Sequence, residues 1–95
     1  SKLDAVVNFV LDPEEIIRFA NDLSRYVENL RSETGALGGS FASLGDTWQD
    51  EKRAAFEEEF NALVNQISQF ESVCEEQHIP YLHALAARLQ EYLQS

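Results

Sequence analysis

Residues 12–30 read DPEEIIRFANDLSRYVENL, and this stretch predicts a long amphipathic helix. Asp12 suits the N-cap position, because its carboxylate can accept hydrogen bonds from the free N–H groups of the first turn. Pro13 suits the first helical position, and Glu15 completes a capping-box pattern. Apolar residues then recur at alternating spacings of 3 and 4, which is heptad spacing. They are Ile16, Phe19, Leu23, Tyr26 and Leu30.

The heptad pattern resumes beyond Thr34, so we expect the first helix to span residues 12–44. Its further positions are Leu37, Phe41 and Leu44. Gly35, Gly38 and Gly39 interrupt this range, and each Gly costs about 1 kcal/mol relative to Ala in a helix. One interpretation is a loop that splits the helix. The other is a close-packing stripe of Gly35, Gly39 and Ala42, and the preserved heptad phase favours this stripe.

Residues 45–49 read GDTWQ and form the one clear turn. Gly45 can adopt the left-handed conformation that ends many helices. Either Thr47 or Asp50 can cap the helix that follows. We therefore expect the chain to reverse at residues 45–49.

Trp48 lies in this turn and is the single Trp of the chain. It could plug the end of the hairpin, or it could be an exposed anchor, since Trp is favoured at interaction hot spots. We expect a structural role first, with packing against Leu44 and Phe56. Asp50 is then the candidate acceptor for the indole N–H.

A second heptad pattern predicts a helix over residues 50–93. Its first positions are Phe56, Phe60, Leu63, Ile67, Phe70 and Cys74, and the phase carries on through Tyr81, Leu85, Arg88 or Leu89, and Tyr92. Pro80 falls inside this run, where it removes one backbone donor and its ring crowds the preceding turn. We therefore expect a kink near Pro80 rather than a new domain.

Two long helices joined by a short turn must lie antiparallel, so the predicted fold is an all-α helical hairpin. We expect one domain over residues 1–95, with residues 1–11 as an extended N-terminal arm. The apolar stripes are wider than one helix contact can cover. A second copy or a similar chain should therefore complete a four-helix bundle. The predicted core and dimer residues are Phe19, Leu23, Leu30, Gly35, Gly39, Phe41, Phe56, Phe60, Ile67 and Phe70.

Charge and hydropathy exclude several classes of partner. The chain has 17 acidic and 7 basic residues, for a net charge of -10. Nucleic acids and anionic membrane surfaces both require a positive surface, so neither is an expected partner. No apolar run approaches the roughly 20 residues of a membrane-spanning helix, so we expect no membrane insertion. The N-terminus lacks the pattern of a Sec-type signal peptide.

Candidate chemical groups are few. Cys74 and His78 are four residues apart on one helix face, but a zinc site needs three or four ligands. We expect Cys74 to be a small core residue. The acidic run at residues 57–59 fits a solvated helix face better than a pair of carboxylates across a cleft. The sequence therefore predicts no enzyme, no metal site and no cofactor.

The helix start, the two heptad helices and the Trp turn resemble the Trp-x-Gly (WXG) family. These are small ESAT-like substrates of type VII secretion systems. The resemblance covers residues 12–95 and includes Ala54, Ala55, Phe56 and Phe60 after the Trp. It implies a hairpin that forms a homodimer, or a heterodimer with a related hairpin. It also implies a secreted or secretion-associated role, export without a Sec signal, and a secretion ATPase as a further partner.

The sequence departs from the family pattern in two places. The motif reads Trp48-Gln49-Asp50, with Asp where the family has Gly. Asp can cap a helix, so the expected fold is unchanged. The Tyr-x-x-x-Asp/Glu signal that family members or their partners often carry near the C-terminus is absent, since Tyr81 precedes Leu85 by four. The alternative function is therefore a cytoplasmic adaptor or chaperone-like binding protein of the same fold.

Overall fold

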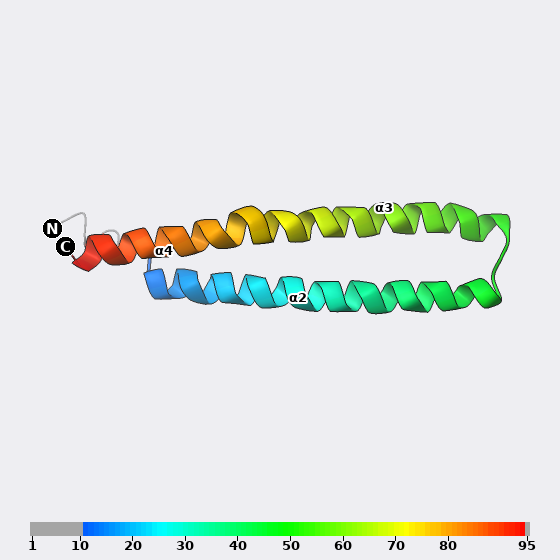
Figure 1. The fold of residues 1–95 in the computed structure, drawn as a ribbon, viewed down its shortest axis with the longest axis horizontal. Coiled ribbons are helices and arrows are strands. Elements are labelled where there is room, and N and C mark those ends of the chain that lie inside the picture. The colour runs from blue at the N-terminus through cyan, green and yellow to red at the C-terminus, as the bar shows by residue number, and fades with distance from the viewer. Residues whose placement is uncertain (1–10, 95) are drawn as a thin grey trace.

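The structure is a computed structural model that describes residues 11–94. Its elements follow in the order α2 (Pro13–Ser43), the short 3₁₀ helix η1 (Leu44–Asp46), α3 (Glu51–Val73), the π-helical turn η2 (Cys74–His78) and α4 (Ile79–Gln94). Figure 1 shows that α2 lies beside the continuous arm formed by α3 and α4. The predicted all-α antiparallel hairpin is confirmed. The predicted arm at residues 1–11 lies, except for Leu11, outside the described residues.

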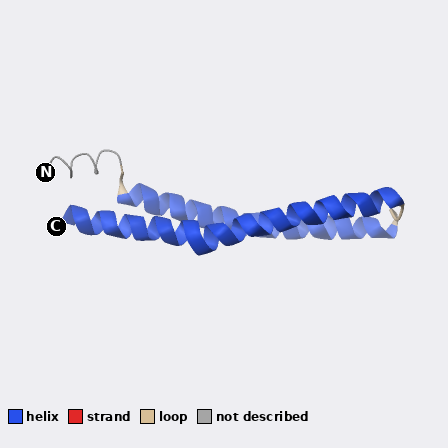
Figure 2. Cartoon of the chain, turned by 90° about the horizontal axis from the view of Figure 1, so that it is seen from above, coloured by secondary structure: helices blue, strands red, loops and turns tan. Residues whose placement is uncertain are grey.

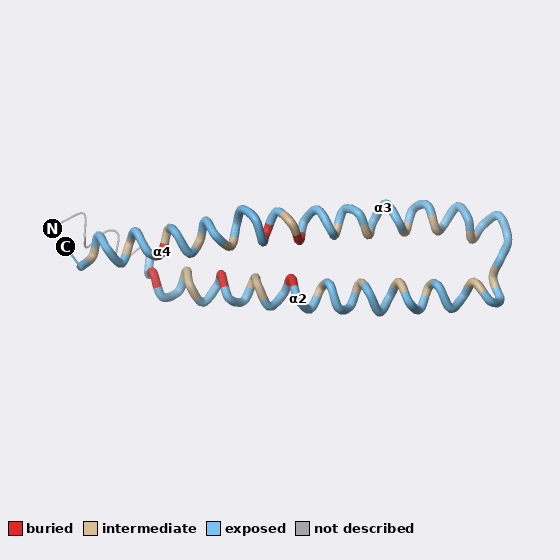
Figure 3. Tube along the Cα trace, viewed as in Figure 1, coloured by how far each residue is buried: buried red, intermediate tan, exposed pale blue. Residues whose placement is uncertain are grey.

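The hairpin is a long, thin rod of 69 × 19 × 17 Å. Seen from above, its two arms cross near the middle of their length, as packed helices do when they coil around each other (Figure 2). A rod two helices thick has no enclosed centre. Almost all of its burial therefore lies along the seam, the line where the two arms touch (Figure 3).

Asp12 begins α2 as predicted. Its side-chain Oδ1 accepts a hydrogen bond from the backbone N–H of Glu14 at 3.0 Å. Its backbone carbonyl accepts from the N–H of Ile16 at 3.1 Å. The first bond satisfies a donor that a helix start leaves without an intrahelical partner, and the second is the first backbone bond of the helix itself.

The glycines of α2 do not break it, because the helix runs without interruption to Ser43. The close-packing stripe, however, is not used within the hairpin. A β-carbon placed on Gly35, Gly38 or Gly39 would meet no atom within 4 Å. The backbone of the opposite arm is therefore not in close contact with these glycines.

Small side chains from α2 fill the most deeply buried part of the seam. Pro13, Ala20 and Val27 are the buried residues of this helix, and they recur every seven residues. The predicted heptad positions of this helix do not coincide with the buried residues, since Phe19 and Tyr26 are more than half exposed. A slim side chain lets two helix axes come close, and the large neighbours are then turned outward. The heptad positions Phe19 and Tyr26 therefore lie beside the helix contact, whereas Ala20 and Val27 lie at its centre.

The π-helical turn changes the phase of the second arm. The N–H of Ile79 donates to the carbonyl of Cys74, five residues back instead of four. Such a turn inserts one extra residue into the helix, and here it lies just before Pro80, which has no N–H to donate. Leu82 therefore faces the seam, whereas Tyr81 is 60% exposed. The prediction that the phase continues from Cys74 to Tyr81 is wrong by one residue.

Replacing Gly39 with Ala should stabilise the hairpin, because Gly39 is exposed, helical and has open space around it. The expected gain is about 0.5–1 kcal/mol in the free energy of unfolding. Urea unfolding followed by circular dichroism would measure it. A loss of stability would show instead that another backbone approaches Gly39 closely.

Candidate docking face

Large apolar side chains on one side of the rod remain open to solvent. They are Phe19, Tyr26, Leu37 and Leu44 of the first arm with Phe56, Leu63, Phe70 and Tyr81 of the second, and each is between 46% and 60% exposed. We call these eight residues the apolar face. Within each arm they are 7 or 11 residues apart, which is close to two or three helical turns, so they repeat along the rod.

Two grooves show that both arms contribute to the same face. The groove near the open end has a volume of about 380 Å³ and is lined by Phe19, Leu23, Phe70, Cys74, His78, Tyr81 and Leu82. The groove near the tip has a volume of about 360 Å³ and is lined by Leu37, Ser40, Phe41, Leu44, Phe56, Phe60 and Leu63. Between them, the Tyr26 and Phe70 rings meet edge to face, with centroids 6.4 Å apart.

The structure divides the predicted core and dimer residues into three groups. Leu23, Leu30, Phe41, Phe60 and Ile67 are half-buried along the seam. Phe19, Phe56 and Phe70 belong to the apolar face. Gly35 and Gly39 are exposed on α2 and belong neither to the seam nor to the apolar face.

The glycine stripe lies on the other side of the rod from the apolar face. Gly35 and Leu37 are two residues apart, as are Ala42 and Leu44, and two residues in an α-helix correspond to a rotation of about 200°. Gly35, Gly38 and Ala42 instead line a separate hollow with polar residues such as Asn61 and Glu57. The stripe and the apolar face are therefore two different surfaces, and the part of the stripe in a dimer contact stays a prediction.

Asp50 organises the turn at the tip. Its Oδ1 accepts hydrogen bonds from the backbone N–H groups of Lys52 at 3.0 Å and Arg53 at 3.1 Å, so Asp50 rather than Thr47 caps α3. The same oxygen accepts the Trp48 indole N–H at 2.9 Å, as predicted. Asp50 therefore joins the helix start and the Trp side chain through one carboxylate oxygen, and Gly has no side-chain oxygen that could accept these hydrogen bonds.

Trp48 is half-buried and packs on Phe56, with ring centroids 6.0 Å apart. Gly45 does not adopt the predicted left-handed conformation, since no glycine among residues 11–94 has a positive φ. Glycine leaves room here for the Arg53 side chain, because a β-carbon on residue 45 would lie 3.3 Å from Nη2 of Arg53. The Gln49 side chain donates to the Gly45 carbonyl at 2.8 Å and closes the turn.

Aromatic rings continue from the tip into the apolar face. The Phe41 ring lies 5.5 Å from Phe56 and 5.1 Å from Phe60, measured between centroids. The Arg53 guanidinium lies 4.7 Å from the Phe41 ring centroid, a cation–π distance. It also forms an ion pair with Glu57 at 3.4 Å. An aromatic cluster of Phe41, Phe56 and Phe60 therefore lies at this end of the rod.

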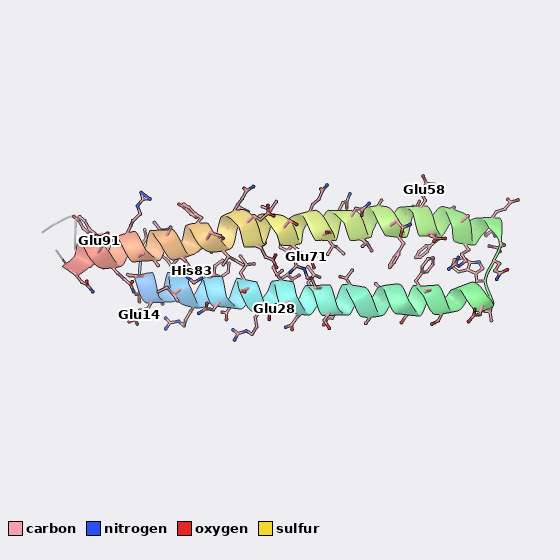
Figure 4. The ribbon with its side chains drawn as sticks, in the orientation of Figure 1. Glu14, Glu28, Glu58, Glu71, His83 and Glu91 are labelled. Atoms are coloured by element: carbon pink, nitrogen blue, oxygen red, sulfur yellow. The ribbon has the colours of Figure 1, made fainter. Side chains whose placement is uncertain are left out.

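A polar layer interrupts the seam halfway along the rod. Glu71 is 6% exposed, and its Oε1 lies 3.7 Å from Nε of Arg31 on the opposite arm. Arg31 also donates to the carboxylate of Glu75. That hydrogen bond lowers the pKa of Glu75 and raises the pKa of Arg31. Figure 4 shows Glu71 pointing between the arms, whereas Glu28 and Glu58 point away from them.

The heptad pattern does not predict this layer, because the pattern is built on apolar residues. Its sequence signal is the position of Glu71, which lies seven residues after Val64 and three before Cys74. A charged residue at a seam position fixes the register of two helices when its partner is on the other helix. Arg31 supplies that partner.

Cys74 is the candidate metal ligand of the sequence, together with His78. Its side chain is buried in the seam, as predicted. Among residues 11–94, no three His, Cys, Asp or Glu side chains gather as they would around a metal ion. Within the same range, none of the helices combines the length and the apolar character needed to cross a bilayer.

Comparisons with known proteins show that the chain is similar to a bacterial protein. The uncharacterized protein YfjA of Bacillus subtilis (strain 168) is 33% identical over 61 residues, which is 64% of this chain. The chain spans about 59% of the length of that relative. No family model matches the chain, and no solved structure matches it.

Replacing Asp50 with Ala should destabilise the hairpin by about 1–2 kcal/mol, because it removes the cap of α3. It also removes the acceptor of the Trp48 indole N–H. Thermal unfolding would measure the loss. Asp50→Asn is the matched control, since the amide oxygen can still accept and most of the stability should remain. Equal stability of the Ala variant and the native chain would contradict this role.

Acidification should weaken the Arg31–Glu75 pair. Because folding lowers the pKa of Glu75 below its usual 4.5, its stabilisation is complete above that value and is lost as pH falls through the folded-state pKa. We expect Glu75→Gln to lose less stability than the native chain between about pH 7 and about pH 3. Melting temperatures of both chains at both pH values test this. Identical changes would show that the pair contributes nothing.

Proposed function

We propose that this protein acts by packing its apolar face against a second helical hairpin, which completes a four-helix bundle. The observation that carries the proposal is the continuity of this face over both arms. An isolated soluble chain rarely exposes so many large apolar side chains in one place, and such a patch is typical of an interaction site. A partner that covers the apolar face would therefore explain why these side chains are exposed in the single hairpin.

We further propose that the bundle belongs to a type VII-like secretion route, as a substrate or an associated component. The support is the combination of a helical hairpin, a Trp at its turn and a bacterial relative. The Trp48-Gln49-Asp50 turn retains a defined structure without the family Gly, because Asp50 supplies the cap. Export without a Sec signal and contact with a secretion ATPase are parts of this proposal.

A charge placed on the apolar face tests the docking role. Leu63 is 50% exposed on this face, whereas Asn65 is two residues on and faces away from it. Leu63→Glu and Asn65→Glu therefore add the same charge to opposite sides of α3. Both should remain helical by circular dichroism.

In the native cells, we expect Leu63→Glu to reduce export at least about tenfold, which corresponds to roughly 1.4 kcal/mol in docking. Asn65→Glu should be exported normally. Immunoblots of culture supernatant, with a cytosolic marker as the lysis control, would measure this. Normal export of Leu63→Glu would contradict the docking role. Retention of the native chain inside cells would favour the intracellular adaptor instead.

A further inference from the structure

We infer that the occupant of the apolar face is a different helical chain with net positive charge, and not a second copy of this chain. The inference rests on the proposed docking function and specifies the partner's chemistry. It is carried by the size of the face, by its repeat along the rod and by the charges at its edges.

The face is large enough for a stable specific complex. Taking about 200 Å² for a whole aromatic side chain, the exposed fractions of its five aromatic residues amount to roughly 530 Å² of surface, and Leu37, Leu44 and Leu63 add to it. A standard interface buries about 800 Å² on each partner. The partner must also be elongated and helical, because the face follows a rod 69 Å long and repeats with helical spacing.

The edge of the face along α2 is acidic. Glu15, Asp22 and Glu33 each lie three or four residues from a face residue or from Leu30, and so they border the face on this arm. No basic residue of α2 occupies an equivalent position. Glu15 and Asp22 form ion pairs with Arg18 and Arg25 of the same helix. Glu33 has no ion pair among residues 11–94.

The edge along the second arm is mixed, with Glu59 between Phe56 and Leu63 and with Lys52 and Arg88 toward the two ends. Arg31 and Arg53 are not free to pair with a partner, since each forms an ion pair with an acid of its own chain. Lys52 and Arg88 are thus the remaining cations of residues 11–94, against a much larger number of unpaired acids.

Two copies of this chain would therefore meet with poor charge complementarity. A homodimer would double a net charge of -10. A symmetric dimer uses the same patch on both subunits, so an arrangement that places α2 on α2 would oppose two acidic edges. A basic hairpin would instead place cations opposite Glu33 and Glu59. Charge complementarity of this kind selects partners and raises the rate of association.

A charge-reversed copy of the chain serves as a defined basic probe. Six exposed acids that form no ion pair among residues 11–94 are changed to Lys in it, which reverses the sign of the net charge. They are Glu28, Glu33, Glu58, Glu59, Glu76 and Glu91. The seam and the apolar face are unchanged in this probe, so its helix content should match that of the native chain.

Sedimentation velocity would then compare the native chain alone, the probe alone and their equimolar mixture. At about 50 mM salt we expect the mixture to form a one-to-one complex at least about tenfold tighter than self-association of the native chain. Its affinity should fall as salt rises to about 500 mM, because salt screens interactions between exposed charges. A probe that also carries Leu63→Glu should not bind.

Three results would overturn the inference. A native homodimer as tight as the mixture would identify a second copy as the occupant and leave the docking function intact. Binding that survives Leu63→Glu in the probe would show a contact outside the apolar face. Absence of association in every sample would remove both this inference and the proposed docking function.

Discussion

Two helices packed side by side can bury only one narrow seam, and the rest of this structure depends on that limit. The seam here is built on slim residues such as Ala20 and Val27. Because they allow close approach, the larger neighbours Phe19 and Tyr26 are turned toward solvent. The same residues that give the helix its strongest apolar signal therefore form the apolar face, and the hairpin is left with a surface that needs a partner.

The π-helical turn keeps this surface continuous. Without the extra residue, Tyr81 and Arg88 would follow Cys74 into the seam at heptad spacing, and Leu82 and Leu89 would turn outward. With it, Leu82 and Leu89 are half-buried and Tyr81 extends the face onto α4. Pro80 fits directly after the turn, since a residue without an N–H leaves one helix bond unmade in any case.

Register along the rod is fixed at two places. At the tip, Asp50 caps α3 and holds Trp48 against Phe56, which sets where the second arm begins. At mid-length, Arg31 reaches Glu71 across the seam, and sliding one arm by a heptad would leave Glu71 buried without its cation. Both contacts align the two halves of the apolar face, so that residues from α2 and α3 can share the same grooves.

The helices, their starts and the reversal of the chain follow from the sequence alone, because caps and heptad spacing act within a few residues of each other. Asp12, Pro13 and Asp50 specify their helix starts locally, and the hairpin follows. Tertiary structure alone decided which edge of each stripe is buried, since that depends on how closely Ala20 and Val27 let the arms approach. It also decided the phase beyond Cys74, because an extra residue in a helix is visible only through its hydrogen bonds and through the opposite arm against which Leu82 packs.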